Sequence, residues 1–146
     1  MTSVLLFFIP FLAQAADPLD LVINEIAWMG TKIEGIESKN WWRYEWLEFY
    51  NNTGNKISIS GWKIELYSND LDWTLPLEGE ILAKGYFLVV SSEKIFPEYN
   101  LNYSNLSGKF KNSGQKVLLK DGEGKIVDEV NCLSGWFAGN NETKRT

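Results

Sequence analysis

Residues 57–66 read ISISGWKIEL, and within this run the apolar side chains change from odd to even positions. They fall on odd positions up to Ile59 and on even positions from Trp62 onward. Side chains alternate between the two faces of a β-strand, so one strand cannot keep both groups on its buried face. A break is required between them, and Gly61 suits the bulge or tight turn that makes one. We therefore predict two short strands on either side of Gly61.

Comparable short runs recur along the chain, rich in Ile, Val, Trp, Tyr and Phe and separated by Gly, Asn and Asp. No window from Ala16 onward has a long helical period, although one helical turn is expected at residues 93–96 after a Ser92 cap. Residues 98–113 are expected to form a loop with at most a short edge strand. This spacing indicates an all-β sandwich or barrel. The further strands are expected at residues 21–28, 45–50, 73–75, 79–83, 85–90, 115–120 and 125–131.

Composition narrows the chemistry that the chain can perform. Its 146 residues, 45% of them hydrophobic, are enough for one domain with a real core. There is no His, which removes the usual general base and the usual metal ligand. With one Cys, Cys132, no internal disulfide or structural zinc site can form, and we expect no catalytic residue, no metal and no cofactor. The net charge of −5 makes nucleic acid an unfavourable partner, because a nucleic-acid binder must neutralise phosphates.

The first residues have the pattern of a secretory signal. An apolar run is followed by Ala13-Gln14-Ala15, with small residues at the two positions that a signal peptidase recognises. We predict a signal peptide at residues 1–15, cleaved between Ala15 and Ala16, and a linker at residues 16–20. The mature chain would then be secreted or held at the cell surface, without a transmembrane segment. A buried N-terminal strand and an uncleaved anchor are the alternatives.

Several short motifs follow one another in the mature region. They are INEIAW at residues 23–28, EWLEFYN at 45–51, ISGW at 59–62, NSGQ at 112–115 and KDGEG at 120–124. In this order and spacing they resemble the lamin-tail domain family, in its bacterial exported type. The parity change at Gly61 coincides with that family's Ser-Gly-Trp corner.

The resemblance implies an immunoglobulin-like β-sandwich over residues 21–146. In nuclear lamins this domain mediates protein contacts and has been linked to DNA, and in bacteria such domains are exported or surface-associated. The family has no accepted catalytic residues, so none is assigned here. Two departures stand out: an aromatic insertion at residues 31–44, and a chain that reaches Thr146 where the family's last strand is expected to begin. We therefore expect part of the last strand to be missing.

The aromatic insertion supplies the candidate binding residues, which are Trp41, Trp42, Arg43 and Tyr44. If the two tryptophans lie on a loop, at least one should be exposed, and exposed aromatic residues beside Arg are typical interface anchors. Packing in the core is the competing interpretation for any single Trp. Stacking on sugar rings is the alternative function for an exposed one.

Two acidic patterns need weighing against simpler interpretations. Glu25 and Glu48 could pair for glycoside hydrolysis, but acidic residues on neighbouring strand surfaces are common, and the simpler interpretation is favoured. Asp70 and Asp72 could bind Ca²⁺ through hard oxygen ligands, yet an Asx-type turn explains them more simply. Cys132 is expected to be a small buried side chain near a strand end.

The sequence therefore predicts a non-enzymatic, exported or surface-associated domain for protein interaction or scaffolding. Its partner would be a protein or another cell-surface component. The alternative is a carbohydrate-binding module that recognises cell-wall or exopolysaccharide glycans through exposed Trp.

Overall fold

The computed structural model describes residues 16–97, 102–103 and 105–139. The predicted signal peptide at residues 1–15 and the final residues 140–146, where an incomplete last strand was expected, lie outside this part of the chain.

The described residues form an all-β fold, as predicted, and contain one short 3₁₀ helix that was not predicted. The helix η1 spans Ser38–Arg43, between the first two strands. The strands are β1 (Leu21–Ala27), β2 (Trp46–Asn51), β3 (Ile57–Ser58), β4 (Lys63–Tyr67), β5 (Leu71–Pro76), β6 (Glu80–Ile81), β7 (Tyr86–Val90), β8 (Asn102–Tyr103), β9 (Lys116–Lys120) and β10 (Ile126–Asn131).

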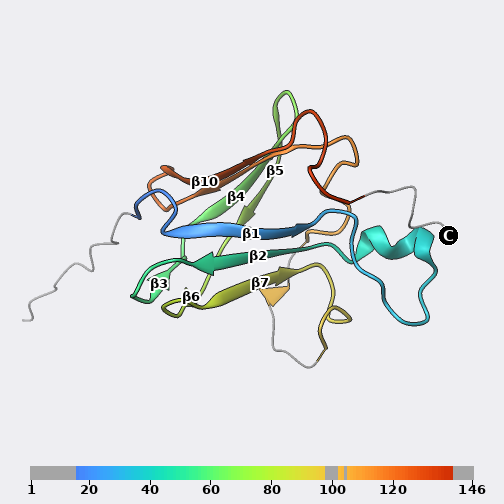
Figure 1. Ribbon diagram of the computed structural model, residues 1–146, viewed down its shortest axis with the longest axis horizontal. Coiled ribbons are helices and arrows are strands. Elements are labelled where there is room, and N and C mark those ends of the chain that lie inside the picture. The colour runs from blue at the N-terminus through green and yellow to red at the C-terminus, as the bar shows by residue number, and fades with distance from the viewer. Residues whose placement is uncertain (1–15, 98–101, 104, 140–146) are drawn as a thin grey trace, which may run out of the picture.

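The strands are arranged in two main sheets that pack as an immunoglobulin-like sandwich (Figure 1). The first sheet has the order β1-β2-β7-β8, and the second has the order β10-β9-β4-β5. All pairs are antiparallel except β7 with β8, and β3 and β6 form a small pair of their own. In the described part of the chain, β1 and β10 are therefore edge strands of their sheets.

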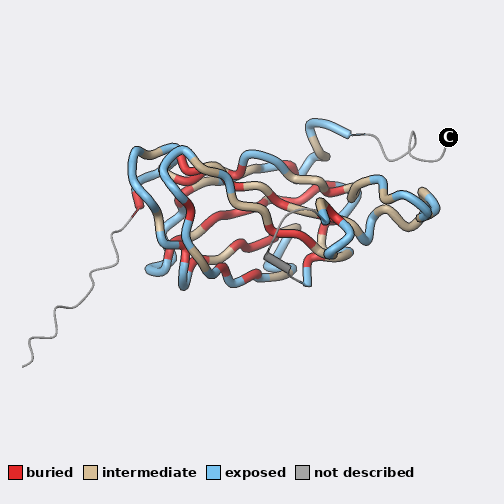
Figure 2. The backbone as a smooth tube through the Cα atoms, turned by 90° about the horizontal axis from the view of Figure 1, so that it is seen from below, coloured by how far each residue is buried: buried red, intermediate tan, exposed pale blue. Residues whose placement is uncertain are grey.

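The core fills the space between the sheets, along the inward-facing positions of each strand (Figure 2). In β2, Leu47 and Phe49 are fully buried, while the residues between them are only half-buried. This is the period of two expected of a strand with one face on the core. The same buried cluster takes Ile64 and Leu66 from β4 and Leu119 from β9.

The parity change in residues 57–66 has the predicted cause. The chain forms β3 and β4 as separate strands, and Gly61 between them has a φ of 82°. The N–H of Trp62 donates to the carbonyl of Ile59 at 3.0 Å, which closes a tight turn. Both Ile59 and Trp62 are buried, so the turn reverses the parity without removing either from the core.

Asn51 fixes the turn that follows β2. Its side chain is fully buried, and its Nδ2 donates to the carbonyls of Asn55, Ile81 and Leu82. Its Oδ1 accepts from both the N–H and the hydroxyl of Thr53. One amide side chain thus joins the β2–β3 turn to the connection between β6 and β7.

Several predicted boundaries differ from the structure. The strand expected at residues 73–75 is longer, and the one expected at 79–83 shrinks to β6. At residues 93–96 a single turn forms in place of a helical turn, although Ser92 accepts a hydrogen bond from the N–H of Lys94 through its hydroxyl.

Residues 16–20 were predicted to be a linker, but in the structure they are attached to the sandwich. Ala16 is 6% exposed, and its carbonyl accepts a hydrogen bond from Nζ of Lys125. The N–H of Leu19 donates to the carbonyl of Val127 in β10. Burial and these hydrogen bonds attach the segment to the sandwich, so it belongs to the folded domain. Its polar, turn-forming residues suggested a linker only because long-range partners cannot be seen in a local pattern.

Candidate interaction site

The connection between β1 and β2 carries the aromatic insertion and is held firmly at its base. The N–H of Thr31 donates to the carbonyl of Tyr44 at 3.0 Å, which brings the two ends of the connection together. Gly30 has a φ of 70°, and a Cβ there would overlap the carbonyl oxygen of Trp41. Only glycine lets the two backbones approach this closely. The end of β1 therefore supports the 3₁₀ helix directly.

The four candidate binding residues lie together on η1 and its C-terminal cap, rather than on an irregular loop. Trp41 is half-buried, and its Nε1 donates to the carbonyl of Ile36 at 3.0 Å. Tyr44 is also half-buried, and its N–H donates to the carbonyl of Trp41. Trp42 is 44% exposed, although exposure was expected for a loop and both tryptophans lie on a 3₁₀ helix.

Trp42 is held in place although it faces solvent. The guanidinium of Arg43 lies over its ring, 5.2 Å from the centroid. Gly108 lies against the ring, because a Cβ there would come within 3.0 Å of Cζ3 of Trp42. The carbonyl of Arg43 accepts a hydrogen bond from the hydroxyl of Ser91 at 2.8 Å. We name Trp41, Trp42, Arg43 and Tyr44 the η1 surface.

The neighbouring Trp46 has a different role. It belongs to β2, is half-buried, and meets the ring of Phe96 edge-on at 5.6 Å. Trp46 therefore packs on the sandwich and is not part of the η1 surface.

A second aromatic group closes the same end of the sandwich, and no local sequence pattern predicts it. Trp28 stacks on Trp136 with ring centroids 5.6 Å apart, and Phe110 meets Trp136 edge-on. The Nε1 of Trp28 donates to the carbonyl of Ala138, and that of Trp136 donates to the carbonyl of Lys111. These bonds hold the connector after β10 against the end of β1. Trp28 and Trp136 stand at opposite ends of the chain, so only the fold shows their pairing.

Glu25 and Glu48 lie on neighbouring strands and face each other in the register of β1 and β2. Glu25 is exposed, and Glu48 accepts a hydrogen bond from Nδ2 of Asn24 at 2.6 Å. Because Leu47 and Phe49 point into the core, Glu48 points outward. Both carboxylates thus lie on the outer surface of neighbouring strands, which is the simpler interpretation given above.

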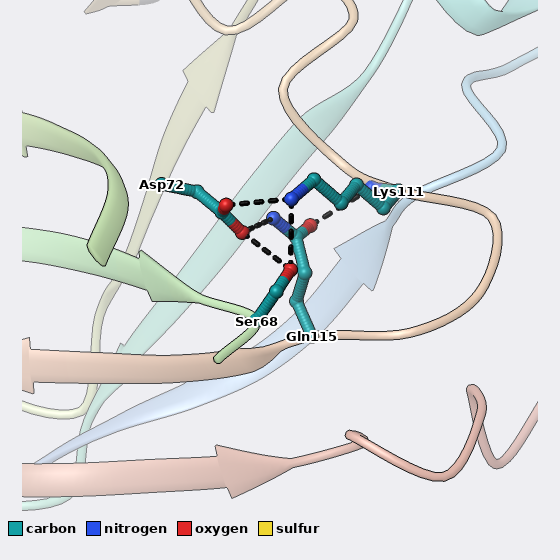
Figure 3. Close-up of polar contacts among 4 residues, drawn as sticks. All are labelled: Ser68, Asp72, Lys111 and Gln115. Carbon is teal, nitrogen blue, oxygen red and sulfur yellow. Dashed lines mark hydrogen bonds and ion pairs between the residues drawn. The ribbon is translucent and has the colours of Figure 1, made fainter. Parts of the chain in front are cut away.

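Asp72 is an acceptor within an intramolecular cluster (Figure 3). Its carboxylate accepts hydrogen bonds from the hydroxyl of Ser68, Nζ of Lys111 and Nε2 of Gln115. Burial alone would raise the pKa of Asp72, but the hydrogen bonds from Lys111, Ser68 and Gln115 lower it to about 2. The carbonyl of Asp70 accepts from the N–H of Ser68, which forms a turn.

This cluster ties the β4–β5 hairpin to the segment before β9. Over the described ranges there is no group of three or more His, Cys, Asp or Glu side chains that could hold a metal ion. Cys132 is 1% exposed, as expected for a buried thiol, and its N–H donates to the carbonyl of Gln115.

The two mainly antiparallel sheets and the buried core between them define the chain as an immunoglobulin-like β-sandwich domain. The family model of the Lamin Tail Domain matches residues 14–133, and the chain belongs to this family. The match includes the motifs at β1, β2 and the Gly61 turn, together with η1. No curated protein matches the chain. Among the residues that the structure describes, none of the helical segments has the length and apolarity needed to cross a membrane.

Proposed function

We propose that this chain is a protein-interaction domain that acts outside the cytoplasm, secreted or at the cell surface, and that its partner docks on the η1 surface. The observation that carries the proposal is an exposed Trp42 with the guanidinium of Arg43 over its ring and Gly108 against it. Trp and Arg dominate the energetic centres of protein interfaces.

Rigidity matters because binding is weakened by every side chain that must be ordered at the interface. Immobilising a flexible side chain costs about 0.5–1.5 kcal/mol. The Arg43 guanidinium and the Gly108 backbone already restrict the Trp42 ring in the free protein. Much of this cost is therefore absent when a partner covers the ring.

The interaction is tested with two single variants that each remove an exposed aromatic ring. Trp42→Ala should weaken partner binding by about tenfold or more, the loss expected for an interface anchor. Tyr86→Ala is the matched control, because Tyr86 is 61% exposed but lies on β7, away from η1. Partners recovered by cross-linking on intact cells would be quantified for both variants. Equal recovery with the two variants would contradict docking on η1.

Glycan binding is the alternative, and a glycan array of the full chain separates it from protein binding. A sugar ring that stacks on Trp42 needs a free ring face, and Arg43 already lies over one face. Glycan signals that Trp42→Ala abolishes would replace the protein-binding proposal. The net charge of −5 likewise weighs against nucleic acid as the partner.

Export rests on the sequence of residues 1–15, with its apolar run and small residues before Ala16. N-terminal sequencing of the protein isolated from its host should begin at Ala16. Recovery of the chain from the cytoplasm with Met1 still attached would refute the exported location.

A further inference from the structure

The edge of the sandwich between β1 and β10 is bridged at two places. At one end, the N–H of Leu19 donates to the carbonyl of Val127, and the N–H of Ile23 donates to Oδ2 of Asp128 at 2.7 Å. At the other end, Nε1 of Trp28 donates to the carbonyl of Ala138 in the connector after β10. Beyond Ile23 a groove of about 540 Å³ runs between residues 23–31 and residues 130–139. Its lining residues come from the edge strand β1 and the residues after it on one side, and from the end of β10 and its connector on the other.

The groove exposes part of the hydrophobic core. Ile26, Met29, Val130 and Trp136 pack against the core cluster, yet each is only partly buried. Phe137 on the rim is 83% exposed, the highest value among the exposed large hydrophobic side chains. Apolar surface left in water at the edge of a core is a driving force for association.

The backbone of β1 offers hydrogen-bonding groups to this groove. The N–H of Asn51 donates to the carbonyl of Gly85, which shows that odd-numbered residues of β2 direct their backbone groups toward β7. The N–H and C=O of Leu47 therefore also point toward β7, because these directions repeat at every second residue. Ile26 lies opposite Leu47, so its N–H and C=O point away from β2, to the outer edge. An outer edge of this kind is a template for another strand.

The charge along the groove selects the partner's chemistry. Glu25 lines the groove, and none of the described lining residues is Lys or Arg. Glu48 lies directly across from Glu25 in β2, and Asp128 accepts the hydrogen bond from the Ile23 N–H at one end of the groove. A basic side chain beside Glu25 is therefore favoured. A second copy of the chain is not, because antiparallel pairing of two β1 strands brings like charges together.

We propose that this groove binds an extended, basic peptide segment of a partner protein, which adds to β1 as a further strand. Alternate apolar side chains of the peptide cover Ile26, Met29 and Trp136, and a Lys or Arg lies beside Glu25. The main-chain bonds give affinity and the side chains give specificity, as in other cases of strand addition. The proposal concerns a surface separate from η1 and does not depend on it.

The test uses the full chain and a random nonapeptide library displayed on phage. Enriched peptides should alternate apolar residues with others and carry Lys or Arg. Their affinity, measured by fluorescence anisotropy with synthetic peptides, should fall about tenfold or more with Glu25→Lys. A similar loss is expected when alternate peptide nitrogens are methylated, because methylation removes the donors that pair with β1. Hydrogen exchange at the Ile26 amide should slow when peptide binds.

Two control variants separate this surface from others. Glu123→Lys makes the same charge change at an exposed position in the β9–β10 turn and should leave affinity within about twofold. Trp42→Ala should also leave the peptide affinity unchanged. The proposal about the groove and the proposal about the η1 surface can therefore be refuted independently. The proposal is overturned if no peptide is enriched, or if enriched peptides bind Glu25→Lys as well as the unaltered chain. It is also overturned if sedimentation shows a dimer that protects the Ile26 amide without peptide.

Discussion

Gly30 allows a direct test of how the end of β1 supports the η1 surface. Its φ is 70°, and a Cβ would overlap the carbonyl oxygen of Trp41 and lie 2.7 Å from its carbonyl carbon. In Gly30→Ala the left-handed conformation costs about 1–2 kcal/mol. The overlap with backbone adds about 1–3 kcal/mol, because a backbone atom cannot rotate away as a side chain can. Part of this is offset by about 0.4–1 kcal/mol, since alanine restricts the unfolded chain.

Gly35→Ala is the matched control. Gly35 has a φ of 75° in the same connection, but a Cβ there would meet nothing within 4 Å. It should therefore show only the conformational cost, about 0–1.5 kcal/mol after the unfolded-state offset. Gly30→Ala should lose about 2–4 kcal/mol, and the difference between the variants isolates the overlap with Trp41.

The free energy of unfolding is measured by urea titration, with tryptophan fluorescence as the signal. In Gly30→Ala, the displaced η1 should also lose partner binding at urea concentrations where the sandwich remains folded. Equal losses in the two variants would refute the reasoning, because they would show that the Trp41 backbone moves aside without cost.

Three further predictions concern stability. Asn51→Ala should cost about 3–5 kcal/mol, since it leaves the carbonyls of Asn55, Ile81 and Leu82, that of Ile81 in a buried bond, without their partner. Asn52→Ala, at an exposed neighbouring position, should cost under about 1 kcal/mol in the same titration. Trp42→Ala should change the free energy of unfolding by less than about 1.5 kcal/mol, whereas a loss of about 3–5 kcal/mol would show that this ring is part of the core. Burial raises the pKa of Glu65, but hydrogen bonds from Lys120, Lys63 and Tyr67 outweigh it and lower the pKa to about 2. Because the folded pKa is lowered, as it is for Asp72, the stabilisation is present above about pH 5 and is lost as the pH falls toward 2. The melting temperature of Glu65→Gln, measured at a series of pH values, should fall less steeply between about pH 5 and pH 2 than that of the unaltered chain. The exposed Glu123→Gln should show the same fall as the unaltered chain.

Local alternation was enough to place most of the sandwich. The parity change around Gly61 depends on the period of two alone, and it correctly divided β3 from β4. The β9–β10 hairpin was also predicted, because Gly122 and Gly124 mark a turn between two apolar runs.

What the sequence could not predict depends on contacts between distant segments. The stacking of Trp28 on Trp136 joins β1 to the connector after β10, and no local pattern contains both residues. The same holds for Ala16, which is buried and accepts a hydrogen bond from the distant Lys125. Exposure of Trp41 or Trp42 was expected for a loop, because the 3₁₀ helix that carries both is too short to show a helical period.

An open sheet edge is a hazard for a domain at high local concentration, because it invites pairing between copies. Three features of β1 limit this. Its register shifts between Ile23 and Glu25. The N–H of Ile23 already donates to the carboxylate of Asp128. Glu25 places a negative charge beside the rest of the strand. Irregular and charged edges disfavour self-association, whereas an extended peptide with a basic side chain can follow the irregular strand and neutralise Glu25. In this proposal Glu25 both disfavours pairing between copies of the domain and selects a basic peptide partner.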